Sequence, residues 1–166
     1  MPAQNKGQTV VLASGVFDLL HLGHVKFLEE AKKYGGKDAK LVVVIARDKT
    51  VEKTKGRRPV VPESERRMLV ESLKVVDQAV LGSENFNLGE MINAINPDVI
   101  ALGYDQTSME KRVEKFVAEN GLNIKVIQVG KYVADELDSS SKIQRKIVEK
   151  WIARQKSSKK TVEKTA

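Results

Sequence analysis

One stretch near the start of the chain constrains its fold more than any other. An apolar run at residues 10–12 leads into a turn at Gly15, and His21 and His24 follow. Apolar side chains then recur at helical spacing, at Leu22, Val25, Leu28 and Ala31. This order predicts a strand, a tight turn and a helix that begins at the histidines. Backbone N–H groups at a helix start lack partners within the helix and bind anions, so we expect phosphates here.

Capping or core packing is the alternative role for the two histidines. They are the only histidines of the chain, and both follow the glycine turn within one window of four residues. We therefore favour a functional role, in which both imidazoles lie on one face of the first helical turn and contact a triphosphate.

Strand-like and helical runs alternate along the rest of the chain. The strand-like runs are residues 40–46, 78–81, 98–102 and 124–129, and the helical runs are residues 62–73, 87–96, 109–120 and about 140–154. Such alternation predicts a parallel sheet with helices on both faces, and ligands at the carboxyl ends of its strands. We expect one nucleotide-binding domain over residues 8–152, and a basic, flexible tail over residues 153–166.

Composition narrows the class of protein. The chain of 166 residues has no cysteine, which excludes disulfides, cysteine zinc sites and thiol catalysis. No apolar run approaches the ~18 residues of a membrane span, and no apolar leader precedes the domain, so we expect a cytoplasmic protein. The formal net charge is +7, and the tail after Trp151 supplies more than half of it. A solvated basic tail and a site for polyanionic nucleotides together account for this charge.

Four further segments carry candidate groups, and each has a local alternative. Residues 53–59 place four cations around Gly56 in a predicted loop, which solvation alone could explain. Arg66 lies in the helix at 62–73, where Glu63–Arg67 is a predicted surface pair and Asp77 a predicted structural residue. Asp105 follows a strand and could cap the next helix. The serines at 139–141 precede the last helix and could cap it.

The motifs resemble those of the cytidylyltransferase-like nucleotidyltransferases. The pattern G-x-F-D-x-L-H-x-G-H at residues 15–24 resembles their HxGH signature, and S-S-S-K-I at residues 139–143 resembles their second signature. The resemblance spans residues 10–147. It implies a single Rossmann-like, three-layer α/β domain with a parallel five-stranded sheet in the order 3-2-1-4-5.

The resemblance also implies roles for particular residues. His21, His24 and Lys55 are the implied catalytic residues, with Lys55 on the β- and γ-phosphates, Lys53 second to it, and Gly56 as the hinge of a lid. The implied nucleotide-binding residues are Gly15, Val16, Phe17, His21, Gly23, His24, Arg66, Asp105, Tyr132, Ser139, Ser140 and Ser141.

Within the family, the archaeal FAD synthases match the most motifs. They share A-R-D at 46–48, K-G-R-R-P at 55–59, V-D-x-A-V-L-G-S at 76–83, L-G-x-D-Q-T at 102–107, and Tyr132. The implied reaction is ATP plus FMN giving FAD plus pyrophosphate. Mg²⁺ or another divalent cation would be held mainly by the substrate phosphates, without a dedicated protein metal site. Tyr132 would lie against the adenine or the substrate ring.

Two alternatives stay open. The first is a cytidylyltransferase or adenylyltransferase acting on glycerol 3-phosphate or another small phosphorylated alcohol or sugar. Glycerol-3-phosphate cytidylyltransferases have an arginine where this chain has Ala134 and a tryptophan where it has Gln106, which argues against cytidylyl transfer. The second is a non-enzymatic nucleotide sensor or nucleic-acid binder. We expect ATP and FMN as partners, no nucleic acid, no membrane and, by resemblance to dimeric relatives, a homodimer.

Overall fold

The computed structural model describes residues 7–132 and 137–163, with side chains described up to residue 156. Its strands are β1 (Val10–Gly15), β2 (Lys40–Ile45), β3 (Gln78–Leu81), β4 (Val99–Gly103) and β5 (Lys125–Val129). They form one sheet in the order β3-β2-β1-β4-β5, and all its strand pairs are parallel. The expected fold class and strand order are therefore confirmed.

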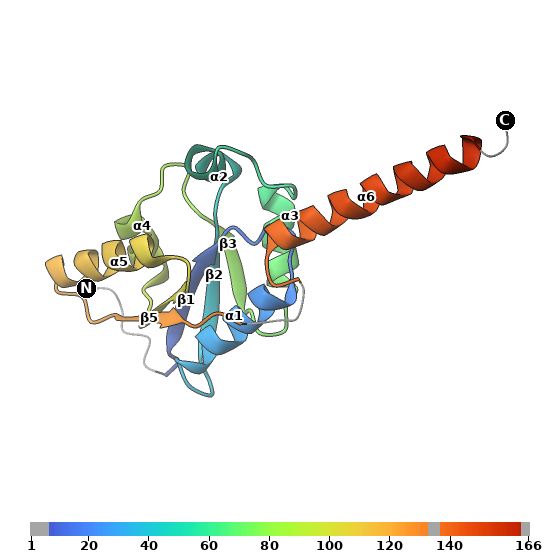
Figure 1. Ribbon diagram of the computed structural model, residues 1–166. Coiled ribbons are helices and arrows are strands. Elements are labelled where there is room, and N and C mark those ends of the chain that lie inside the picture. Colours follow the sequence, from blue (N-terminus) through green and yellow to red (C-terminus); the bar gives the residue numbers. More distant parts are fainter. Residues whose placement is uncertain (1–6, 133–136, 164–166) are drawn as a thin grey trace.

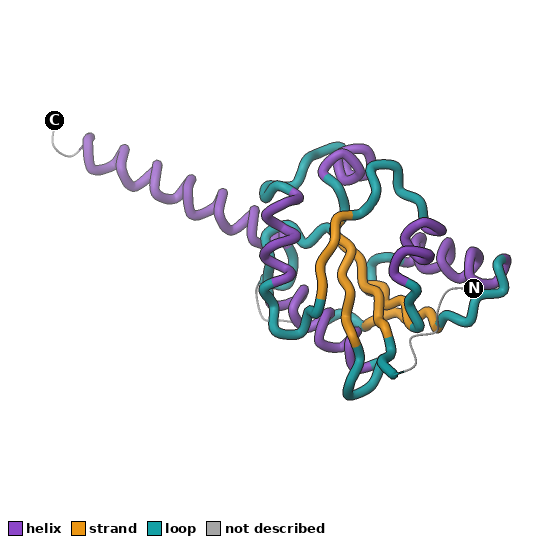
Figure 2. Tube along the Cα trace, turned by 180° about the vertical axis from the view of Figure 1, so that it is seen from behind, coloured by secondary structure: helices purple, strands orange, loops and turns teal. Residues whose placement is uncertain are grey.

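Helices cover both faces of this sheet (Figures 1 and 2). The helices are α1 (Leu22–Lys33), α2 (Asp48–Lys55), α3 (Glu63–Glu71), α4 (Leu88–Ile95), α5 (Thr107–Glu119) and α6 (Ser140–Glu163). Alternate residues of the central strand point to opposite faces: Val11 packs with α1 and α3, whereas Leu12 packs with α4 and α5. Strands buried on both faces explain the continuous apolar run of β2.

Two helices differ from expectation. The segment predicted as a basic loop begins inside α2, whose last turn contains Lys53 and Lys55. Helix α6 continues to Glu163 instead of ending near Arg154, and it projects away from the domain (Figure 1). Part of the expected tail is thus helical, while residues 164–166 lie outside the described chain. No helix within the described residues is long and apolar enough to cross a membrane.

Candidate active site

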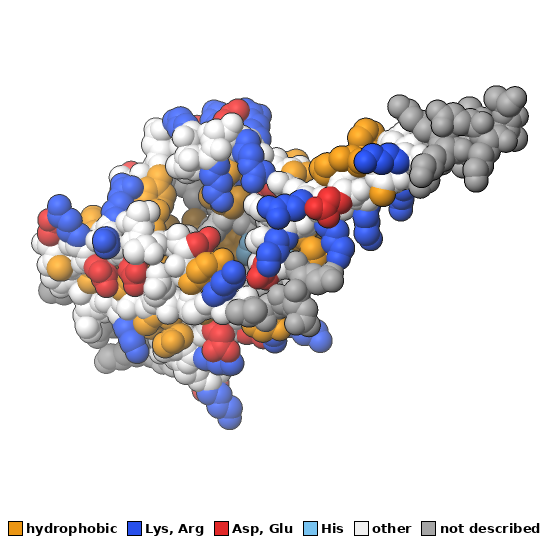
Figure 3. Space-filling view, viewed as in Figure 1, with side chains coloured by type: hydrophobic (Ala, Val, Ile, Leu, Met, Phe, Trp, Pro, Cys, Tyr) orange, Lys and Arg blue, Asp and Glu red, His pale blue; other side chains and the backbone are white. Residues whose placement is uncertain are grey.

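The two histidines form a stacked pair where β1 passes into α1. His21 is the N-cap residue of α1, and its ring lies 3.8 Å from that of His24, centroid to centroid, at an angle of 26°. Phe17 packs beside the pair, with its ring centroid 5.2 Å from that of His24. In the described part of the chain, the Nδ1 atoms of both rings are buried and have no hydrogen-bond partner. A histidine surface is visible beside a hollow in Figure 3.

The surroundings of both imidazoles favour the neutral form. Burial, the neighbouring His21 and the cation of Lys55 lower the pKa of His24 to about 4, although Asp18 acts in the opposite direction. Burial also lowers the pKa of His21, although the negative charge of Asp138 acts to raise it. A polyanion bound beside the pair would reverse this balance, because it favours the charged form of each ring.

The turn before the histidines has an unusual backbone. Phe17 and Leu19 have φ angles of 54° and 47°, in the left-handed region that few residues other than glycine adopt. Gly15 makes room for this turn, because a Cβ there would lie 2.8 Å from Cε2 of the Phe17 ring. The turn is therefore fixed by contacts from elsewhere in the chain.

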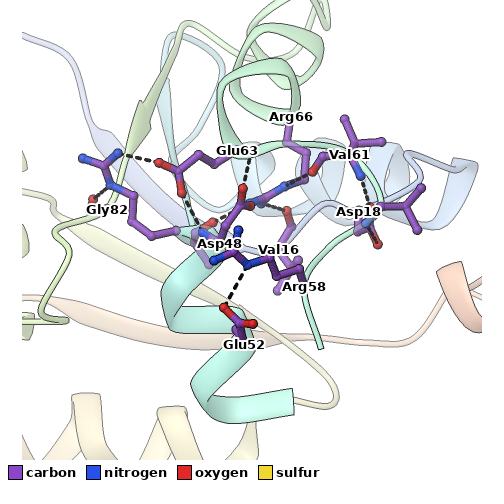
Figure 4. Close-up of polar contacts among 12 residues, drawn as sticks. Val16, Asp18, Asp48, Glu52, Arg58, Val61, Glu63, Arg66 and Gly82 are labelled. Carbon is purple, nitrogen blue, oxygen red and sulfur yellow. Dashed lines mark hydrogen bonds and ion pairs between the residues drawn. The ribbon is translucent and has the colours of Figure 1, made fainter. Parts of the chain in front are cut away.

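Asp18 supplies the first of those contacts (Figure 4). Its buried carboxylate accepts hydrogen bonds from the backbone N–H groups of Val60 and Val61, at 3.1 and 3.0 Å. Its backbone carbonyl accepts a hydrogen bond from the Ser140 hydroxyl. One residue thus joins the histidine turn to the segment before α3 and to the start of α6. Asp18 was not predicted as a site residue, although it stands within the signature.

Arg66 supplies the second contact, and its implied nucleotide-binding role stays a prediction. Its side chain is 0% exposed, and its guanidinium donates to the carbonyls of Val16, Ala46 and Val61. It also pairs with Asp48, with 2.6 Å between Nη2 and Oδ1 (Figure 4). The resemblance implied a nucleotide-binding Arg66, but here its three nitrogens are all engaged by the protein. In this structure Arg66 ties the ends of β1 and β2 to α3.

Helix α2 brings cations towards the histidines. Lys55 lies close enough to His24 to lower the pKa of that imidazole. Gly56 follows as the C-cap with a φ of 69°, which favours glycine and lets the chain turn sharply. Both Lys53 and Lys55 are exposed, so they are available to a ligand. Their phosphate-binding role stays a prediction.

The start of α6 forms another wall of the histidine site. A Cβ at Gly23 would lie 3.0 Å from the backbone oxygen of Asp138 and from the ring of His21, so a larger residue there would force one of these neighbours to shift. The Ser139 hydroxyl accepts from the N–H of Lys142 at 3.3 Å, which is a cap, and Ser141 is exposed. A hydrogen bond from Lys142, 2.7 Å long, holds the pKa of Asp138 below its usual range. The three serines are thus next to the histidines, where capping and phosphate binding use the same donors.

The carboxyl end of β4 lies on the other side of β1. Asp105 is exposed there and does not cap α5, because Gln106 occupies the N-cap position. The Gln106 side chain accepts from the N–H of Gly103 at 2.7 Å and donates to the carbonyl of Ser14 at 3.4 Å, which joins β4 to β1. Tyr132 is exposed after β5. Ala134 lies outside the described residues.

Several known proteins are similar to this chain in sequence. The model of the cytidylyltransferase-like family matches residues 12–146. The chain belongs to this family. A protein named FAD synthase from Methanobrevibacter smithii is 52% identical over 137 residues, which are 82% of this chain and 89% of the relative. A second FAD synthase, from Methanopyrus kandleri, is 47% identical over 142 residues, which are 85% of this chain and 93% of the relative.

Solved structures share the fold. A lipopolysaccharide core biosynthesis protein from Thermoplasma volcanium superposes with a TM-score of 0.64 at 39% identity, over 76% of this chain and 100% of that chain. A pantoate-beta-alanine ligase from Francisella tularensis reaches a TM-score of 0.60 at 13% identity, over 81% of this chain and 63% of that chain. The second likeness shows the fold alone.

Proposed function

We propose that this protein transfers AMP from ATP to FMN, which yields FAD and pyrophosphate. The observation that carries the proposal is the stacked histidine pair at the start of α1, with two buried Nδ1 atoms that lack partners among the described residues. The relatives named FAD synthase, at 42–52% identity over most of the chain, support FMN as the acceptor. They also disfavour the alternative of glycerol 3-phosphate or a similar acceptor.

The reaction needs stabilisation of charge more than it needs a base. An oxygen of the FMN phosphate attacks the α-phosphorus of ATP, a new P–O bond forms, and the bond to the bridging oxygen of pyrophosphate breaks. The FMN phosphate is largely ionised at neutral pH, because its second pKa is near 6. The electron pair leaves with pyrophosphate, so positive charge and N–H donors around the phosphates lower the barrier.

In this proposal the residues of the site divide that work. His21 and His24 donate hydrogen bonds to the phosphates and take up protons as the anion approaches. Lys55, with Lys53 behind it, neutralises the β- and γ-phosphates, and Ser139–Ser141 add hydroxyl and N–H donors at the start of α6. The backbone lies close to the nucleotide at Gly15, Val16, Phe17 and Gly23. The nucleoside part of the nucleotide is bound by Asp105 and Tyr132.

The side chains of the site fit a Mg²⁺ ion that binds together with ATP. Among the described residues, no three His, Cys, Asp or Glu side chains form a group that could hold a metal ion. The buried carboxylate of Asp18 is already engaged by two backbone N–H groups. A Mg²⁺ ion would therefore be held by phosphate oxygens and water, where it adds positive charge to the reacting phosphates.

The same proposal includes a homodimer, formed through α6. Ile147, Val148, Trp151 and Ile152 form an exposed apolar stripe on the projecting helix, and Trp151 is 61% exposed. A contiguous apolar surface of this kind is typical of a protein interface. A second copy that presents the same stripe can bury it symmetrically. Neither nucleic acid nor a membrane takes part in the proposed reaction.

An assay of pyrophosphate release with Mg²⁺ tests the function. ATP and CTP are each combined with FMN and with glycerol 3-phosphate, and FAD is identified by chromatography. We expect turnover with ATP plus FMN, and a loss of ~10²-fold or more in kcat for His21→Ala or His24→Ala, the size expected for a lost electrostatic stabiliser. Turnover with CTP plus glycerol 3-phosphate, or full activity in the double variant, would refute the assignment.

A further inference from the structure

A groove beside the histidine site has no role in the mechanism above. It encloses about 700 Å³ and is lined by residues 83–90 and by Arg112, Lys115, Phe116 and Glu119 of α5. Its walls are the loop after β3, the first turn of α4 and one side of α5, two helices that lie next to each other in Figure 1. This volume is in the range of small-molecule sites, about 300–1,000 Å³.

The loop that forms one wall of the groove lies at the same edge of the sheet as the histidines. Its loop follows β3 directly, and all carboxyl ends of a parallel sheet lie at one edge. Two strand spacings, or about 10 Å, separate β3 from β1. Helix α2 lies between the loop after β3 and the histidines. At its start, Arg47 donates a hydrogen bond to the carbonyl of Gly82, and Lys49 lies 3.8 Å from Glu84. At its end, the cation of Lys55 lowers the pKa of His24.

The chemistry of the groove suits a flat aromatic ring with polar edges. Phe86, 37% exposed, and the half-buried Phe116 offer two aromatic faces. The guanidinium carbon of Arg112 lies 5.0 Å from the centre of the Phe86 ring. Gly89 lets α4 approach Phe116, because a Cβ there would lie 3.2 Å from Cζ of that ring. Arg112 and Lys115 provide N–H donors, and the pyrimidine edge of an isoalloxazine is rich in oxygen and nitrogen acceptors.

We infer that this groove binds the isoalloxazine ring of FMN, an inference that rests on the proposed function. The ring stacks on Phe86, Arg112 turns from the Phe86 face to the acceptor atoms of the ring edge, and the ribityl chain leads the phosphate towards the histidines. The acceptor thereby enters from the β3 side, past α2. Tyr132, beyond β5 at the opposite edge of the sheet, is then left for the adenine.

Single substitutions in the groove test this inference by FMN binding as well as by turnover. FMN is titrated with protein, and quenching of flavin fluorescence gives its dissociation constant; KM is measured separately for FMN and for ATP. Phe86→Ala and Arg112→Ala should each raise the dissociation constant and the KM for FMN about tenfold, and leave the KM for ATP within about twofold. Phe86→Tyr keeps an aromatic face and should restore FMN binding.

Lys111→Ala is the matched control, because it removes a neighbouring cation of α5 that does not line the groove. Arg112 lies on an exposed part of α5, so its variant tests the inference even where Phe86→Ala fails to fold. If the wild-type protein makes FAD and both alanine variants bind FMN normally, the ring binds elsewhere and the inference is wrong. If the wild-type protein makes no FAD from ATP and FMN, the proposed function itself fails, and the inference with it.

Discussion

Acidification should destabilise this protein through His24. The imidazole has its ordinary pKa of 6.5 when the chain is unfolded, whereas burial beside His21 and Lys55 lowers the pKa to about 4 in the folded state. Between these values the unfolded state binds more protons, so the free energy of unfolding falls as the pH falls. The difference of about 2.5 units corresponds to about 3 kcal/mol at about 1.4 kcal/mol per unit. The lowered pKa of His21 adds in the same direction.

Urea unfolding at several pH values between 7.5 and 4 measures this effect. The comparison protein is His24→Gln, because it lacks the titrating ring and keeps every carboxylate of the wild type. We expect the wild-type protein to lose about 3 kcal/mol more stability than the variant over this range. Parallel curves for the two proteins would show that His24 is not buried in its neutral form. Proton NMR gives an independent check, because the chain has two histidines and therefore two signals to assign.

A saturating triphosphate with Mg²⁺ should raise both histidine pKa values in the same NMR titration. The expected movement is upward, because the bound anion favours each imidazolium. Unchanged signals in the presence of a nucleotide that binds would place the phosphates away from the pair.

Two further substitutions test other parts of the structure. Arg66→Met should destabilise the protein by about 3–5 kcal/mol in urea unfolding, because it leaves Asp48 and three carbonyls without their buried donor. A variant with the stability of the wild type but weaker ATP binding would instead support the implied phosphate contact. Trp151→Lys should shift sedimentation from dimer to monomer by placing a charge in the apolar stripe of α6; a wild-type protein that sediments as a monomer at every concentration would rule out the proposed interface.

The sequence predicted those parts of the fold that apolar patterns define. The strand, turn and helix around Gly15 follow from alternation and helical spacing, and the strand order followed from the family resemblance. Helix α2 was missed because Val51 is its only buried residue, so no apolar period distinguishes it from a loop. The length of α6 was underestimated for a related reason, since residues 153–163 contain few apolar side chains.

The roles of individual polar side chains were harder to predict. Asp77 accepts from the N–H of Leu41 and from Lys32, which confirms its structural role. The contacts of Arg66 could not be predicted from the sequence. Two of its acceptors lie 50 and 20 residues earlier in the chain, and they are backbone carbonyls, which every residue has. The groove near α4 was not anticipated for the same reason, since Phe86 comes from the loop after β3 and Phe116 from α5.

The hydrogen bond from Ser140 to Asp18 spans 122 residues of the chain. During synthesis the histidine turn leaves the ribosome early, whereas Ser140, which donates the hydrogen bond to this turn, emerges near the end. A growing chain therefore carries both histidines long before the site around them can close. We therefore expect chains that end before the serines to lack this hydrogen bond and the wall that the start of α6 gives the site.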